Sequence, residues 1–323
     1  MINNTLPYKT KQFFFVLIKL SIVVGAFYFI FEKLTTNDEL QFSIFIDFLS
    51  KKGVFSLKNS SFLLLLSTFN WFFEIFKWQY LVSSIKKITF KNALEQSLGA
   101  LTASLFTPNR IGEYGAKAIY YTASFRKRIM LVNLLSNLLQ MSVTTILGVI
   151  GLYFLVAKYN IAIDYDKLVW LFIVMVITTS LIVYGIKKST FTVKGFSLEK
   201  VKHFIISFPR SKLILGFLFS LIRYTIFSFQ FYFLLHLFDV NISYLNAMII
   251  ITSMYLLTSV IPSIFVFDVI IKGSVAIYLF SFINANELVI LSIITTMWLF
   301  NFVLPSIFGS YYVLNFKLLK KDD

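Results

Sequence analysis

The sequence contains no cysteine and only two histidines, His203 and His236, which lie far apart along the chain. Disulfides and thiol chemistry are therefore excluded. No group of histidine and carboxylate residues has the spacing of a metal site. We accordingly predict neither a metal nor any other cofactor.

Charge is also scarce, since only 14% of the residues are charged while 58% are hydrophobic and 19% are aromatic. Soluble domains are about 45–50% apolar, so this composition indicates a membrane protein. Runs such as SFLLLLSTFNWFF, at residues 61–73, suit helices that cross about 30 Å of hydrocarbon. No polar segment is long enough to bury a core of its own. The sequence predicts an all-α integral membrane protein with a single membrane domain, residues 1–323.

Hydropathy predicts six full-length spans and two further apolar regions that are each broken by a proline. The spans are expected at about residues 13–31, 61–82, 129–157, 168–186, 213–238 and 288–312. The broken regions are 94–123, interrupted at Pro108, and 246–283, interrupted at Pro262. Because the pieces on either side of Pro108 are too short for two spans, we predict re-entrant hairpins. The alternative is that the broken regions span the membrane, as in an eight-span protein.

The net charge of +15 is unevenly distributed over the predicted loops. With a cytoplasmic N-terminus, the cytoplasmic segments hold eighteen basic and three acidic residues, against six and eight in the outside segments. This asymmetry follows the positive-inside rule, which explains the positive charge without nucleic acid. We expect both termini in the cytoplasm and residues 13–31 as a retained helix, since no small-residue cleavage site follows the first residues, MINNTLPYKTK.

The predicted layout repeats the order span, span, hairpin, span in opposite orientations. Such inverted repeats place two broken segments opposite each other near the membrane midplane. Glu113 and Lys117 are four residues apart, as are Asp268 and Lys272, and each pair is followed by Ala-Ile-Tyr. Chance similarity between apolar stretches is the alternative explanation. The predicted pseudo-repeats are about residues 13–157 and 168–312.

Ten charged residues remain inside the predicted apolar segments. Each costs roughly 2.5–3.5 kcal/mol at the centre of a membrane helix, so such residues tend to pair, snorkel or line a wet cavity. Lys19 lies near a helix end and can snorkel. Glu74 and Lys77 are three residues apart, which predicts a local pair, and Glu95 is expected to be solvated.

The stretch TPNRIGEYGAKA, residues 107–118, concentrates charge directly after a proline. Glu113 and Lys117 have the spacing of a helical ion pair, and Arg110 can share their face. A half-helix N-terminus with free N–H groups and a guanidinium forms an anion site, in which Glu113 would hold Arg110 or carry a proton. The alternative is a buried salt bridge that fixes the hairpin.

The same stretch carries the residues expected to shape the hairpin. Pro108 restricts the backbone, and Thr107 or Asn109 can cap the helix that follows. The two glycines leave the backbone accessible or let another helix pack closely. The predicted hinges are Pro108, Gly112, Gly115 and Pro262.

Arg223 is the only charge in LGFLFSLIRYTIFSF and needs an acid, carbonyl groups or an anionic ligand. Asp268 is the acid expected to serve it, with Glu113 as the candidate across the repeat interface. Hydrogen bonds between helices explain most of the remaining polar residues in the spans. These are Asn70, Asn133, Asn137, Gln140 and Gln230.

With these motifs, the chain resembles the flippase-like transmembrane domain of bacterial lysylphosphatidylglycerol synthases, a domain that also occurs in stand-alone proteins. TPNRIGEYGAKA resembles the family's Pro-x-Arg-x-Gly-Glu motif, and WFFEIFKWQYLV, residues 71–82, is similar to the end of its second helix. IPSIFVFDVIIKG matches the second-half motif of an acid soon after a proline, but residues 263–266 lack the glycines often found there. The soluble aminoacyl-transferase domain is missing, so the resemblance is to a stand-alone member.

The resemblance implies a bacterial inner-membrane lipid translocase or lipid-binding transporter for an anionic phospholipid or lipid phosphate, and not an enzyme. The two arginines would contact phosphate, the lysines would add positive potential and the acids would orient or release them. No nucleotide-binding motif is present, so turnover would be passive or driven by a gradient. The headgroup residues are expected to be Arg110, Glu113, Lys117, Arg223, Asp268 and Lys272.

Two alternatives come from other functional classes. One is a membrane-embedded enzyme or accessory protein acting on polyprenyl-phosphate glycans, for which only Glu113 and Asp268 could serve as bases. The other is a structural partner of an envelope glycosyltransferase or synthase. Replacing Glu113 should abolish an enzyme, impair a transporter and leave the partner binding of a scaffold intact.

Overall fold

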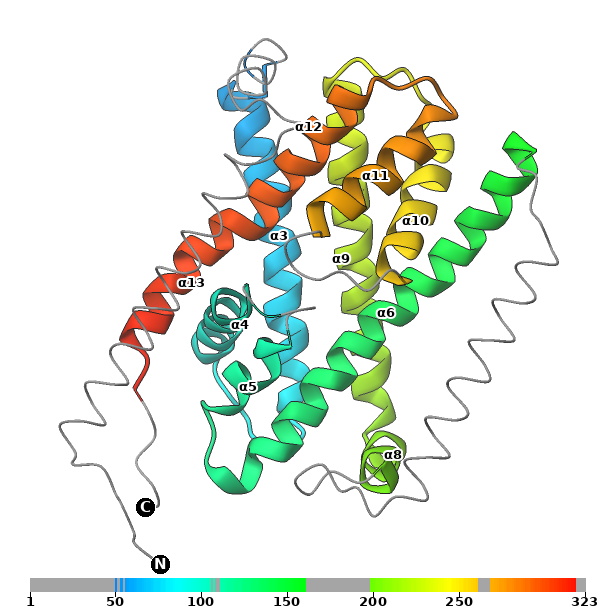
Figure 1. The fold of residues 1–323 in the computed structure, drawn as a ribbon. Helices are drawn as coiled ribbons and strands as arrows, with labels where there is room; N and C mark the ends of the chain where they lie inside the picture. The colour runs from blue at the N-terminus through cyan, green and yellow to red at the C-terminus, as the bar shows by residue number, and fades with distance from the viewer. Residues whose placement is uncertain are drawn as a thin grey trace, which may run out of the picture.

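A computed structural model of the chain describes residues 50, 53–54, 56–105, 107, 111–160, 198–260 and 268–317, with side chains except at 198–200 and 268–271. Every regular element in these ranges is a helix, which confirms the all-α prediction. The elements are α3 (Leu57–Val82), α4 (Phe90–Ser104), α5 (Gly112–Ala118), α6 (Ala123–Tyr159), α8 (Leu198–Ser207), α9 (Arg210–Leu237), α10 (Tyr244–Val260), α11 (Asp268–Ser281), α12 (Glu287–Trp298), η3 (Leu299–Val303) and α13 (Leu304–Asn315) (Figure 1).

Three helical units are long and apolar enough to cross a membrane, and they correspond to three predicted spans. They are α6, α9 and the continuous unit α12–η3–α13. Helix α3 has 26 residues but is more polar, because Asn70, Glu74 and Lys77 lie on it. The chain is therefore a membrane protein, and the predicted spans 13–31 and 168–186 lie outside the described residues.

Both proline-broken regions consist of shorter helices. Helices α4 and α5 have 15 and 7 residues, about 22 and 10 Å long, so neither alone crosses 30 Å of hydrocarbon. Helix α10 ends at Val260 and α11 begins at Asp268, on either side of the predicted break. In Figure 1, α4 and α5 lie toward one end of the long helices, and α10 and α11 lie toward the other.

The helix after the first break ends before the predicted apolar region 94–123 does, because α5 ends at Ala118. The backbone of Thr122 is extended (φ −62°, ψ 157°), so the chain reverses there and starts α6. Helix α6 consequently begins six residues before the predicted span at 129.

The long helices pack in three main pairs. Helix α3 lies against α9, α6 lies against α10, and α13 lies against α4. Figure 1 shows α6 and the α12–α13 unit as slanted helices on opposite sides of the bundle, with α3 and α9 between them. The central pair therefore faces helices from both halves of the chain.

The apolar core of the described residues consists of two clusters. Both include residues of α3, α6 and α9, but at different levels along these helices. The first contains Leu63 of α3, Leu155 of α6 and Leu234 of α9, together with residues of α10, α11 and α12. The second contains residues 75–82 of α3 and 129–135 of α6, with Leu213 of α9 packed against it. The segments between these levels carry the polar side chains described next.

Candidate functional site

The polar side chains form a layer at the middle of the long helices. Asn70, Gln140, Arg223 and Asn301 each lie at or next to the midpoint of α3, α6, α9 and the α12–η3–α13 unit, respectively. Each of them makes a side-chain hydrogen bond to another member of the layer. The layer therefore links four long helices at one depth.

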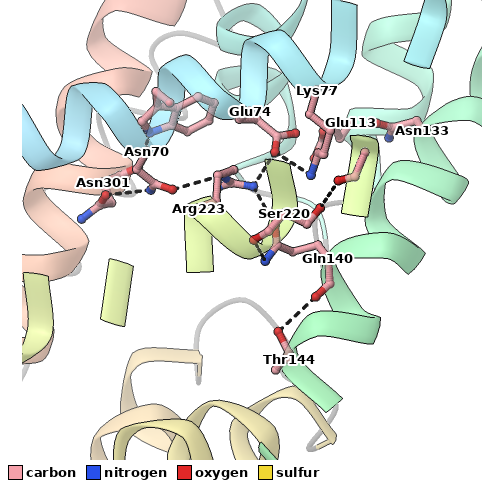
Figure 2. A network of polar contacts seen from close by, with 12 residues as sticks. Asn70, Glu74, Lys77, Glu113, Asn133, Gln140, Thr144, Ser220, Arg223 and Asn301 are labelled. Atoms are coloured by element: carbon pink, nitrogen blue, oxygen red, sulfur yellow. Dashed lines mark hydrogen bonds and ion pairs between the residues drawn. The ribbon is translucent and has the colours of Figure 1, made fainter. Parts of the chain in front are cut away.

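Glu74 is the central acid of this layer. Its Oε2 atom accepts from Lys77 Nζ at 2.8 Å and also from Arg223 NH1 (Figure 2). The predicted local pair of Glu74 and Lys77 is therefore confirmed. The ion pair of Arg223 is with Glu74, which the sequence analysis had not assigned to it, and not with Glu113. The side chain of Asp268, the other expected partner, lies outside the described residues, so that expectation stays a prediction.

Two amide oxygens complete the contacts of the Arg223 guanidinium. Its Nε donates to Asn70 Oδ1 at 3.0 Å, and NH1 also donates to Gln140 Oε1 at 3.3 Å. The NH2 group makes no hydrogen bond to any described residue, and 20% of the Arg223 side chain is exposed. Arg223 thus retains donor capacity that no described residue uses, in a side chain that is partly exposed.

Asn301 lies in the π-helical turn η3 and hydrogen-bonds to the side-chain amides of Asn70 and Gln230. Its Oδ1 accepts from Asn70 Nδ2 at 3.0 Å, and its Nδ2 donates to Gln230 Oε1 at 2.9 Å. Pro305, four residues later, has no N–H to donate to the Asn301 carbonyl. That carbonyl instead accepts from Trp71 Nε1 at 2.9 Å, so α3 supplies the missing donor.

Lys117 forms a second buried ion pair, as the sequence predicted. Its Nζ lies 2.7 Å from Glu113 Oε1 and donates to Asn133 Oδ1 at 2.9 Å. The same ammonium stands 4.3 Å from the ring centre of Trp78. Only 1% of the Lys117 side chain and 10% of that of Glu113 are exposed. Lys117 also lies close enough to Glu74 for electrostatic interaction, so the two ion pairs form one charged cluster.

At the start of α5, one of the N–H groups expected to be free is occupied. The N–H of Gly112 donates to Thr107 Oγ1 at 2.9 Å, although the N-cap position is Ile111, without a side-chain cap hydrogen bond. A Cβ at Gly112 would meet Thr107 atoms at 2.8 Å, so close packing explains this glycine. A Cβ at Gly115 would have nothing within 4 Å, so there the backbone is accessible. Pro108, Asn109 and Arg110 lie outside the described residues.

The predicted site residues in the second half of the chain are Pro262, Asp268 and Lys272. No contact between described residues connects them to the charged cluster. Lys272 is half-buried on α11, and no such contact links it to Glu74, Arg223 or Lys117. Asp268 begins α11, but its side chain is outside the described part of the structure. Pro262 lies outside it as well. Their predicted roles in a headgroup site stay predictions.

Comparison with known protein families identifies the chain. The model of the lysylphosphatidylglycerol synthase TM region matches residues 16–309. The chain belongs to this family. Neither the comparison with curated proteins nor that with solved structures found a match. The family resemblance predicted from the motifs is confirmed, and it gives the protein a membrane setting related to lipids.

Several residues of this charged cluster and polar layer were not assigned to a common site in the sequence analysis. Glu74 and Lys77 were assigned only to each other, because their spacing shows the local contact and not the neighbouring helix. Asn301 was not singled out, although an amide in the apolar run WLFNFVLP, four residues before a proline, was an available signal. Asn133 was expected to bond between helices, and it does so with Lys117.

The charges of the described cluster suit an anion better than a cation. Lys77, Lys117 and Arg223 contribute three positive charges, whereas Glu74 and Glu113 contribute two negative ones. Within the described ranges, no group of three His, Cys, Asp or Glu side chains could hold a metal ion. A buried surplus of positive charge attracts an anionic ligand, and a guanidinium can bind phosphate oxygens in pairs.

Proposed function

We propose that this protein is a lipid translocase or lipid-binding transporter that handles an anionic phospholipid or lipid phosphate. The observation that carries the proposal is a charged cluster that includes Arg223, in contact with the polar layer at the midpoints of four long helices, in a member of a lipid-related membrane family. Charged side chains at this depth are costly and commonly mark a substrate pathway. A phosphate near Arg223 would use the donor that no described residue occupies.

The packing of the helices supports an inverted repeat. If α3 corresponds to α9, α4 to α10 and α6 to α12–α13, the α4–α13 pair corresponds to the α10–α6 pair. The α3–α9 pair then corresponds to itself. Transporters built in this way place the substrate between the repeats near the midplane, and the polar layer at the midpoints of the long helices suits such a site.

The proposed site combines residues from the described cluster with those of the family-like motifs. Arg223 and Arg110 would contact the phosphate, while Lys117 and Lys272 would raise the local positive potential. Glu113 and Asp268 would orient or release these cations. The proposal includes no catalytic step, and it places the protein in the bacterial inner membrane with both termini in the cytoplasm.

The test is a dithionite bleaching assay in liposomes that contain tail-labelled fluorescent phosphatidylglycerol. We expect wild-type protein to expose label beyond the outer-leaflet fraction and Arg223→Gln to slow this at least about tenfold. Arg210→Gln is the matched control, because it removes the same charge from an exposed position on the same helix.

Two results would count against the proposal. One is wild-type bleaching equal to that of protein-free liposomes. The other is equal slowing by Arg223→Gln and Arg210→Gln, because the central cluster would then have no special role. Glu113→Gln, measured in parallel, should slow translocation without abolishing it, whereas an enzyme that depends on this acid would lose all activity.

A further inference from the structure

The contacts of Glu74 are divided between two cations of unequal accessibility. One carboxylate oxygen, Oε2, accepts from both Lys77 and Arg223 (Figure 2). The Lys77 side chain is 1% exposed and has no other hydrogen-bond partner among the described residues, whereas Arg223 is 20% exposed and also donates to two amides. Each cation is therefore only partly neutralised by this acid.

The two contacts also differ in how easily they can change. Glu74 and Lys77 are three residues apart on α3, so their contact is maintained by the helix itself. The contact with Arg223 joins two different helices, α3 and α9. Loss of the Arg223 contact would leave Glu74 with Lys77, and neither of those buried charges would become unpaired.

We propose that Glu74 is an internal competitor for the anionic substrate of Arg223. This inference rests on the proposed function and adds a specificity-determining residue that is not among the six predicted headgroup residues. In the empty site the Glu74 carboxylate occupies the NH1 donor. A bound phosphate takes NH1 together with NH2 as a paired acceptor, and Glu74 then neutralises Lys77 alone. Return of Glu74 to Arg223 promotes release of the anion.

The competition predicts the effects of two substitutions on binding. Glu74→Gln keeps the shape and an acceptor oxygen but removes the charge, so the anion should bind about tenfold more tightly. Its release should be slower, so translocation should fall although binding improves. Lys77→Met leaves Glu74 entirely to Arg223 and should weaken anion binding.

The double variant Glu74→Gln/Lys77→Met separates competition from a general charge effect. It removes one negative and one positive charge, so the net charge of the cluster equals that of the wild type. If competition for Arg223 matters, the double variant still binds the anion more tightly than the wild type. If only net charge matters, its affinity equals that of the wild type. The double variant also leaves no charge at positions 74 and 77 without its counter-charge, so it should still fold.

The experiment titrates the purified full-length chain in neutral detergent with short-chain phosphatidylglycerol and follows binding by microscale thermophoresis. Short-chain phosphatidylcholine and glycerol 3-phosphate are run in parallel to separate an anionic lipid from a neutral headgroup and from a free phosphate ester. Melting temperatures identify variants that do not fold. The expected order of affinity for phosphatidylglycerol is Glu74→Gln and the double variant above the wild type, and the wild type above Lys77→Met.

The outcomes distinguish this inference from the proposed function. If wild-type protein binds phosphatidylglycerol but the folded double variant binds no more tightly, Glu74 is not a competitor and the proposed function stands. If wild-type protein binds no anionic lipid, the proposed function fails and this inference fails with it. Equal binding of glycerol 3-phosphate would replace the lipid by a soluble phosphate ester and would overturn the lipid as the competing anion.

Discussion

At the scale of single residues, neutral acceptors contact two of the three cations in the described charged cluster. Lys117 is held by Glu113 and by the Asn133 amide, and Arg223 is held by Glu74 and two amides. An amide oxygen accepts a hydrogen bond without adding negative charge, so it stabilises the cation but leaves its charge effective. Such groups fix the geometry of a cationic site and preserve its attraction for an anion.

The Lys117 ion pair leads to a prediction about stability. Lys117→Met removes the ammonium that lies 2.7 Å from the buried Glu113 carboxylate, so we expect a loss of about 3–5 kcal/mol in the free energy of unfolding. Adding Glu113→Gln should recover part of this loss, because the carboxylate that Lys117 neutralises is then uncharged as well. The melting temperature of the purified protein in detergent is the measurement.

The control for this prediction is Lys127→Met, which removes an exposed lysine near the start of α6. It should change the melting temperature little, since exposed charges contribute little to stability. If Lys117→Met has as small an effect as Lys127→Met, the buried pair does not stabilise the fold as described.

At the scale of elements, glycines allow two helix pairs to approach closely. A Cβ at Gly309 of α13 would lie 2.2 Å from the Leu98 carbonyl oxygen and 2.3 Å from Thr102 Oγ1 of α4. A Cβ at Gly151 of α6 would lie 2.0 Å from Thr252 Oγ1 of α10. Both contacts join a long helix to the first helix of a broken region, so small residues set how closely these elements pack.

Alanine substitutions at Gly309 and Gly115 should change stability differently, because only Gly309 lies in the close contact between α4 and α13. Gly309→Ala places a methyl group against a backbone carbonyl that cannot move alone, so we expect a loss of about 1–3 kcal/mol in stability. Gly115→Ala, on α5 with nothing within 4 Å of its Cβ, should be neutral or should gain up to about 1 kcal/mol. Thermal unfolding in detergent measures both, and equal effects would contradict the close approach at Gly309.

At the scale of the whole molecule, the polar layer lies between two apolar clusters, and the two sets of short helices lie toward opposite ends of the bundle (Figure 1). Hairpins that enter the membrane from both sides, as the sequence predicts, would produce this arrangement. The transport proposal therefore depends on which side of the membrane each loop faces.

The absence of cysteine makes this topology directly measurable. Ser84→Cys and Ser124→Cys should react with a membrane-impermeant maleimide from the cytoplasmic side, and Asn160→Cys should react from the opposite side, because one hairpin and one span separate them. Thr107→Cys should not react from the outside, since it lies near the tip of the first hairpin. Outside labelling of Thr107→Cys would show that this region spans the membrane instead of re-entering.

The sequence by itself determined the helical membrane class, the breaks near the two prolines and the local ion pairs of Glu74 with Lys77 and Glu113 with Lys117. These features depend on composition and on spacings within one turn of a helix, which a single sequence displays directly. The family resemblance rested on motifs of the same short range.

Which helices share the polar layer depends on tertiary packing. Arg223 and Glu74 are separated by 149 residues along the chain, and their contact depends on the rotation and depth of α3 and α9. Those quantities follow from the packing of all the apolar faces together, so the spacing of residues along the chain did not indicate Glu74 as the partner of Arg223. The Gly112 N–H was likewise taken by Thr107, because the hairpin closes tightly enough to satisfy its own backbone.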